Sequence, residues 1–322
     1  MEIVAADIGG THARFALAEI EGGRVVRLGE AITLNTVEHA SLETAWEFFG
    51  KELGQALPRA AAIAVACPIA GEVLKLINNP WVIRPDTIGE RLGVDRVTLL
   101  NDFGAVAHAV VRVGHESFSH LCGPDLPLPE DGVISIVGPG SGLGTALALR
   151  RHGRDHVVEC EGGHMDYAPV DTIEDAILAR LRQRFGRVSV ERILSGPGLA
   201  NIYEALAAID GKAVRVGNDK ELWAAALSGT DSLAVAALDR FCLILGSVAG
   251  NIALAHAARA VVIAGGLGLR IAEVLPRSGF STRFTAKGRY ERLLSAIPVK
   301  IITHPQPGLF GAAAAFAAEH DR

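Results

Sequence analysis

The sequence has little of what marks secreted or nucleic-acid-binding proteins. Its four cysteines are far apart in 322 residues and form no C-x-x-C pair, a usage typical of a reducing cytoplasm. There is no block of lysine and arginine, and the net charge is −5, so no nucleic-acid partner is expected. The segment MEIVAADIGG has no basic region of the kind that begins a signal peptide. We therefore expect a cytoplasmic protein with small-molecule partners.

Two phosphate-binding motifs are missing, and one apolar run needs an explanation. Neither G-x-G-x-x-G nor G-x-x-x-x-G-K-[ST] fits the glycine-rich segments, so any nucleotide site must use another loop. Residues 241–258 carry no charge over 18 positions, which is near the length of a spanning helix. They include Ser247, Asn251, His256 and two glycines, and this favours a buried helix. We expect no membrane span.

What is present is a strand–glycine turn–strand pattern that occurs twice, at residues 3–18 and 133–149. Residues 115–132, with glycine and three prolines, read as a connection. Because strands alternate with helices elsewhere, we predict an α/β protein with mostly parallel sheets. The hairpin starts differ from the plan of dinucleotide-binding folds, which begin with βαβ. Further strands are expected at 60–69, 96–100, 260–266 and 299–303, and helices at 171–185, 190–208, 220–228, 231–258, 268–276 and 309–320.

Each hairpin turn is a candidate phosphate loop. Gly9 and Gly10 allow close backbone approach, Thr11 adds a hydroxyl, and Asp7 can hold a hydrated Mg²⁺; the alternative is a plain turn in which Asp7 binds loop amides. The second turn has four glycines in seven positions, which cost about 0.5–1 kcal/mol each in backbone entropy. A plain turn needs fewer, so a phosphate-contacting loop is favoured there.

A polar pair, Asn101-Asp102, follows the strand expected at 96–100. Open α/β sheets bind ligands at the carboxyl ends of their strands, where Asp102 could take a proton from a substrate hydroxyl and Asn101 could orient that substrate. Alternatively, either residue caps a helix that starts near Gly104. The two roles are compatible.

Two further segments carry acids beside glycines. Glu161 and His164 flank Gly162-Gly163, and their side chains suit the hydroxyls of a polyol. A metal site is the alternative, because His152, His156, Cys160 and His164 recur every four residues; the glycines and the strand-like HVVEC argue against the helix this would need. Glu191 lies just inside an expected helix start, where it either complements the helix N-terminus or reaches the ligand of Glu161.

The chain resembles a known family from Asp7 to Ala317. The segments ADIGGTHARFALAE, AIAVACPIAG, LLNDFGAVA, VGPGSGLGTAL, ECEGGHMDYAP, SVERILSGPGLANIY and VIAGG are similar to conserved blocks of bacterial ATP-dependent glucokinases that lack the ROK cysteine motif. The resemblance implies an α/β, actin/hexokinase-like (ribonuclease H-like) duplicated fold. It implies a smaller domain of residues 1–110 plus about 304–322, a larger domain of 111–303, and a cleft between them.

The resemblance also implies the activity and its residues. The reaction would be ATP-dependent phosphorylation of D-glucose at the 6-hydroxyl, giving glucose 6-phosphate and ADP, with Asp102 as general base. Other sugar contacts would come from Asn78, Asn101, Glu161, His164 and Glu191. The ATP phosphates would contact Gly9, Gly10, Thr11, Gly138, Gly140, Ser141 and Gly142; Gly265 and Gly266 would lie near the adenosine, and Asp7 would hold Mg²⁺, through water. We expect no zinc, and a homodimer. His12 stands where some relatives have asparagine.

Two other functions are compatible with parts of this pattern. A kinase for another hexose would share the fold and most of the site. A non-catalytic sugar sensor or repressor would be expected to carry an N-terminal DNA-binding helix pair, whereas here the first hairpin begins at residue 3. An actin-like filament-forming ATPase would have no use for the polar cluster at 161–164.

Overall fold

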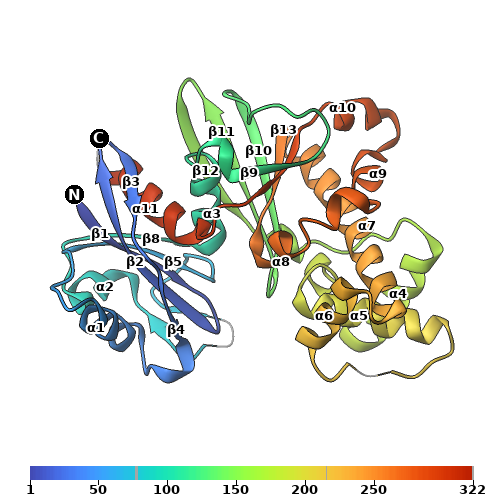
Figure 1. Ribbon diagram of the computed structural model, residues 1–322, viewed down its shortest axis with the longest axis horizontal. Helices are drawn as coiled ribbons and strands as arrows, with labels where there is room; N and C mark the ends of the chain where they lie inside the picture. Colours follow the sequence, from blue (N-terminus) through green and yellow to red (C-terminus); the bar gives the residue numbers. More distant parts are fainter. Residues whose placement is uncertain (77–78, 215, 321–322) are drawn as a thin grey trace. The chain divides into compact units, whose positions relative to one another are not determined.

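The computed structural model describes residues 1–76, 79–214 and 216–320 (Figure 1). Contacts divide the chain into two compact units, one formed by Met1–Gly114 with His304–Arg322 and the other by His115–Thr303. The sequence predicted divisions after residues 110 and 303, whereas the contacts place them after residues 114 and 303. The C-terminal segment therefore belongs with the N-terminal one, and each unit is described by itself.

The first unit is built on one sheet whose strands run in the order β3-β2-β1-β5-β8, with β4 also paired to β2. The strands β1 and β2 are antiparallel, whereas β1, β5 and β8 are parallel to one another. The strand bounds are β1 Glu2–Ile8, β2 His12–Glu21, β3 Arg24–Leu28, β4 Ile32–Asn35, β5 Ala60–Val65 and β8 Arg96–Asn101, with the small hairpin of β6 Leu74–Lys75 and β7 Val82–Ile83 beside it.

Helices cover both faces of this sheet, which explains why β5 is buried along its whole length. Alternate residues of β1 enter two separate cores. Val4, Ala6 and Ile8 pack with the face that α1 covers, while Ile3 and Ala5 pack with α11. The helix bounds are α1 Leu42–Leu53, α2 Pro85–Leu92, α3 Asp102–Val110 and α11 Pro307–His320.

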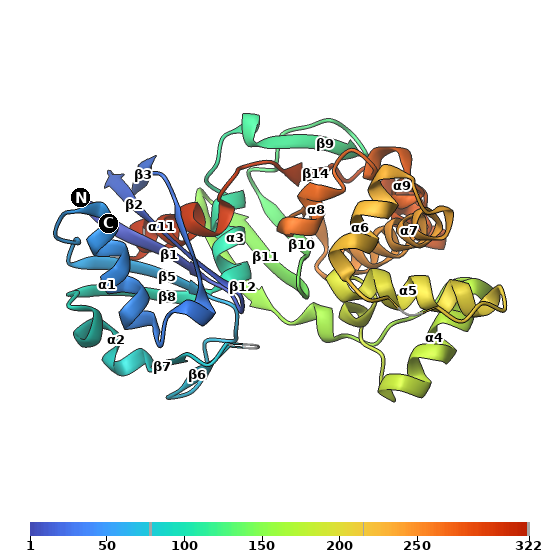
Figure 2. The same cartoon turned by 60° about the horizontal axis from the view of Figure 1, so that its bottom comes forward.

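The second unit repeats the arrangement. Its sheet has the order β12-β11-β10-β13-β14, extended by β9. The strands β10 and β11 form an antiparallel hairpin, and β13 and β14 follow in parallel. Figure 2 shows this sheet and the helices of the same unit. The bounds are β9 Phe118–Cys122, β10 Gly132–Pro139, β11 Leu143–Arg151, β12 Arg154–Cys160, β13 Ala258–Ile263, β14 Val299–Ile302, α4 Thr172–Phe185, α5 Gly196–Ile209, α6 Asp219–Ser228, α7 Ser232–Ala255, α8 Gly265–Arg270, α9 Phe280–Thr285 and α10 Glu291–Ser295.

Both sheets thus have the same order. Three antiparallel strands come first, β3-β2-β1 in one sheet and β12-β11-β10 in the other, and two strands parallel to the last of them follow, β5-β8 and β13-β14. The duplication predicted from the two hairpins is confirmed. The apolar run of residues 241–258 belongs largely to α7, which packs against α5, α6 and α9. Within the described residues it is the one helix long and apolar enough to cross a membrane, and 67% of its most apolar stretch is buried. Burial in the core of this unit accounts for its composition.

Three local predictions were wrong in part. Residues 115–132 are not only a connection, because β9 forms there as an edge strand that pairs with β14; only its Leu121 is buried, so the pattern along the chain is too weak to show it. The helix expected at 190–208 begins at Gly196, after a 3-10 turn. The helix expected at 268–276 is α8, which ends at Arg270.

Candidate active site

The turn between β1 and β2 holds Gly9, Gly10 and Thr11 at the carboxyl end of β1. The Gly9 N–H donates to the His12 carbonyl at 2.9 Å. The Gly10 carbonyl accepts from the Thr36 hydroxyl at 2.9 Å. These bonds fix the turn, and Thr11 is exposed on it. The His12 side chain is exposed as well, and His12 contacts the turn through its carbonyl.

Asp7 lies at the end of β1 with one fifth of its side chain exposed, and its Oδ2 is 3.3 Å from the Arg14 guanidinium. Burial raises the pKa of its carboxyl above the ordinary value, and the charge of Arg14 opposes this. Asp7 lies on the same face of β1 as Ile3 and Ala5, so its side chain points toward α11. A Cβ at Gly308, in the first turn of α11, would lie 2.7 Å from Oδ2. The carboxylate therefore sits against a helix start that only glycine leaves open.

Asn101 and Asp102 join β8 to α3. The Asn101 Oδ1 accepts from the amides of Phe103 at 2.8 Å and Gly104 at 3.3 Å, so the cap interpretation is confirmed. Its Nδ2 donates to the Cys67 carbonyl at 3.2 Å, which ties the pair to the end of β5. The Asp102 Oδ1 also accepts from Phe103 N–H, at 2.9 Å. Both side chains are partly exposed and held in one orientation.

The register of the first sheet brings the turn after β1 and the Asn101-Asp102 pair after β8 to the same end of the sheet. Ile8 pairs with Val65, and Val65 pairs with Asn101. Since neighbouring strands lie about 4.8 Å apart, the end of β1 and the start of α3 are separated by roughly 10 Å. The predicted phosphate turn and the predicted base thus meet at the same end of one sheet.

The second glycine loop, between β10 and β11, is closed by its own backbone. The Gly140 N–H donates to the Gly142 carbonyl at 2.8 Å, and the Gly140 carbonyl accepts from Gly196 N–H at 2.8 Å. Gly138 is buried within β10, and Ser141 is exposed at the tip of the loop. The loop is therefore held by a bond within itself and by a bond to the start of α5.

Gly265 and Gly266 begin α8 beside this loop. Gly265 has a positive φ of 78°, and a Cβ there would lie 2.5 Å from the Pro139 carbonyl oxygen. Pairing of Val137 with Ile263 brings the two segments to the same edge of the second sheet.

The turn that carries Glu161 and His164 packs against the same loop. A Cβ at Gly163 would lie 2.3 Å from the Leu143 carbonyl oxygen, and the Gly162 N–H donates to the buried Thr145 hydroxyl at 2.8 Å. Glu161 Oε2 and His164 Nε2 are 3.9 Å apart, and each side chain is more than half exposed. They can therefore reach a ligand together.

Glu191 joins this group through the loop backbone. Its Oε2 accepts from the Leu143 N–H at 3.0 Å, so Leu143 contacts both the Glu161–His164 turn and the Glu191 carboxylate. The structure brings Gly140, Gly142, Glu161, His164 and Glu191 together within the second unit. Val190–Arg192 is a 3-10 turn, and the Glu191 carboxylate binds the amide of Leu143. The contact that Glu191 makes is therefore with the glycine loop, and not with the N-terminus of the helix that follows.

Sequence reasoning missed two residues that shape these sites, Thr145 and Gly308. Thr145 follows the glycine loop directly and could have been suspected from that position. Gly308 lies in a helix of small residues and carries no local signal. The predicted Asn78 lies outside the described residues.

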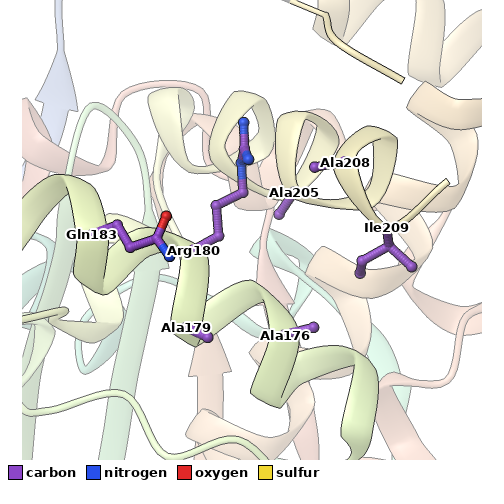
Figure 3. A pocket seen from close by; sticks show the side chains of 7 residues that line it. All are labelled: Ala176, Ala179, Arg180, Gln183, Ala205, Ala208 and Ile209. Atoms are coloured by element: carbon purple, nitrogen blue, oxygen red, sulfur yellow. The ribbon is translucent and has the colours of Figure 1, made fainter. Parts of the chain in front are cut away.

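Two other parts of the second unit carry features that could suggest a site. His156 and Cys160 lie on the strand β12, where a spacing of four residues spans roughly 13 Å; among residues 1–76, 79–214 and 216–320 no group of three or more potential ligands is placed to hold a metal ion. A pocket of about 300 Å³ lies between α4 and α5, and Figure 3 shows the side chains that line it. Its lining is Ala176, Ala179, Arg180, Gln183, Ala205, Ala208 and Ile209, which include none of the predicted site residues.

Comparisons with known proteins agree on one family. A family model described as Glucokinase matches residues 4–319. The chain is 64% identical over 317 residues to a glucokinase of Zymomonas mobilis, covering 98% of each protein. The crystal structure of a glucokinase from an Antarctic psychrotroph superposes with a TM-score of 0.84 at 31% identity and 98% coverage of each chain.

A more distant structure shows the fold alone. A ROK family glucokinase from Streptomyces griseus, determined with glucose and AMPPNP, has a TM-score of 0.62 at 20% identity, covering 98% of this chain and 99% of that one. The duplicated sheets are thus those of the actin/hexokinase-like fold.

The duplicated sheets and the two glycine loops agree with the match along nearly the whole chain. This protein therefore belongs to the glucokinase family, enzymes that phosphorylate glucose with ATP.

Proposed function

We propose that the chain transfers the terminal phosphoryl group of ATP to the 6-hydroxyl of D-glucose, giving glucose 6-phosphate and ADP, with Asp102 as general base. The observation that carries this proposal is the placement of Asp102 at the end of β8. Its carboxylate is oriented by the Phe103 amide, and it lies on the same sheet edge as the phosphate turn after β1.

A base is useful here because phosphoryl transfer depends on positioning and charge neutralisation more than on covalent chemistry. Asp102 would accept the proton of the sugar hydroxyl as the bond to phosphorus forms, a contribution of roughly 10²–10⁴-fold. Asn101, proposed from the resemblance to bind a sugar hydroxyl, would also support Asp102 by capping α3, because its bonds to Phe103, Gly104 and Cys67 hold the start of the helix in place.

The remaining sugar hydroxyls would bind Glu161, His164 and Glu191. The contacts of Leu143 support this, since they gather the three side chains on one side of the second glycine loop. Each group would discriminate between sugars because an absent hydroxyl leaves its partner unpaired, at about 1–3 kcal/mol. Asn78 stays a predicted neighbour of this set.

The ATP phosphates would contact Gly9, Gly10, Thr11, Gly138, Gly140, Ser141 and Gly142, with Gly265 and Gly266 near the adenosine. Asp7 fits a role at the magnesium ion, because carboxylate oxygen is a preferred ligand and its side chain is partly exposed. Magnesium bound with ATP would supply charge neutralisation at the phosphates. Asp7 would hold the ion through water, while the loop amides would bind phosphate oxygens.

A coupled assay of ATP-dependent phosphorylation tests the proposal, with glucose, mannose, fructose and N-acetylglucosamine compared side by side. We expect glucose to give the highest kcat/KM. A clear preference for another of these sugars would assign the same site to a different hexose kinase. We further propose that the enzyme acts in the cytoplasm as a homodimer, without nucleic-acid or membrane partners and without zinc.

A further inference from the structure

The second glycine loop contains two glycines with different surroundings. A Cβ built on Gly142 would lie 2.4 Å from Glu191 Oε2 and 3.1 Å from its Cδ. A Cβ on Gly140, two residues earlier, would meet no atom within 4 Å. Only the later position is therefore closed to a side chain by the carboxylate of Glu191.

Backbone conformation does not explain the glycine at position 142. Its φ lies outside the left-handed range, so an alanine could adopt the same backbone conformation. What glycine provides here is room: with no Cβ, the Glu191 carboxylate can approach until Oε2 accepts the Leu143 N–H at 3.0 Å.

The backbone beneath Glu191 is firmly held. Val190 N–H donates to the Met165 carbonyl at 2.9 Å, and the Asn201 side chain donates to the Arg192 carbonyl at 2.7 Å. Ile193, next along the chain, is fully buried. A side chain at position 142 would therefore displace the flexible end of Glu191 and leave the turn that carries it in place.

We propose that Gly142 is a positioning residue for the sugar site: its missing side chain lets Glu191 dock on the Leu143 amide, in the orientation that binds glucose. The proposal rests on the sugar-binding role of Glu191 given above. It adds a second role to a loop assigned to ATP, because one glycine of that loop would set the affinity for the sugar.

The test is direct glucose binding without nucleotide, by calorimetry, on the full chain. Gly142→Ala should weaken glucose binding roughly 10- to 100-fold, the effect of losing one hydrogen bond to a charged group. Gly217→Ala is the control, because Gly217 is an exposed glycine of the same unit, outside the proposed site, where a Cβ would also meet no atom within 4 Å; it should leave the glucose dissociation constant within about twofold. Thermal melting of each variant shows whether it is folded.

A double-mutant cycle with Glu191→Ala separates the roles. Once the carboxylate is removed, Gly142→Ala should add no further loss, so the double variant should bind glucose like Glu191→Ala alone. Glu191→Asp gives an independent check, because a side chain shorter by one methylene draws the carboxylate away from Leu143 without altering the loop. It should weaken glucose binding to a degree similar to Gly142→Ala.

The outcomes distinguish this proposal from the one on which it rests. If Glu191→Ala binds glucose normally, Glu191 is not a sugar ligand and both proposals fail. If Glu191→Ala weakens binding while Gly142→Ala does not, or if the two losses multiply in the double variant, only the role of Gly142 is refuted. Normal glucose binding by Glu191→Asp would also refute it.

Discussion

Replacing Asp102 with asparagine should separate the chemistry of this enzyme from its folding. The new side chain has nearly the same shape, and its Oδ1 can still accept the Phe103 N–H, which lies 2.9 Å from the present carboxylate oxygen. The cap from Asn101, with bonds of 2.8 and 3.3 Å, is unchanged. What is lost is one negative charge and the ability to accept a proton.

The two consequences differ greatly in size. Losing a negative charge at the N-terminus of α3 should cost about 0.3–1 kcal/mol of folding stability. Losing a general base should lower turnover roughly 10²–10⁴-fold, which corresponds to about 2.7–5.5 kcal/mol of activation free energy. Glucose binding should weaken far less than turnover.

The assay is glucose phosphorylation with ATP, coupled to oxidation of the glucose 6-phosphate, alongside calorimetric glucose binding and thermal melting. Asp86→Asn is a suitable control, because Asp86 is an exposed acid in the first turn of α2 and its loss removes the same charge from another helix start. The reasoning is refuted if Asp102→Asn turns over within tenfold of the unchanged chain while binding glucose normally.

Three further substitutions test the supporting structure. Asn101→Ala removes the cap of α3 and should cost about 1 kcal/mol, seen as a lower melting temperature that Asn101→Asp restores; an unchanged melting temperature would contradict the cap. Arg240→Met should cost about 1–3 kcal/mol in urea unfolding, because Arg240 lies 3.1 Å from Glu174, which is 1% exposed, while Arg283 at 3.3 Å still faces that carboxylate; a loss below about 0.5 kcal/mol would show that this ion pair contributes little. Gly308→Ala puts a Cβ 2.7 Å from the Asp7 carboxylate, so it should displace that carboxylate even though alanine favours a helix. Turnover should fall roughly tenfold, and the Mg²⁺ concentration that gives half the maximal rate should rise. A normal magnesium titration would argue against Asp7 as a magnesium-binding residue.

Local sequence was sufficient wherever the interaction is local. The two hairpins could be predicted because apolar strands flank glycine turns within a few residues of each other. The cap by Asn101 could be predicted because its partners, Phe103 and Gly104, are two and three positions away. The conserved segments and their order along the chain also predicted the glucokinase family, and the comparisons confirm this prediction.

The edge strand β9 and the surroundings of the acids were decided only by tertiary structure. The pairing of β9 with β14 joins residues about 180 positions apart, and such pairing leaves little trace in a segment with one buried residue. Glu191 reaches the amide of Leu143 across 48 positions, and Asp7 meets Gly308 from the other end of the chain. A carboxylate and a glycine can be recognised in a sequence, but whether one makes room for the other depends on distances that only the folded chain sets.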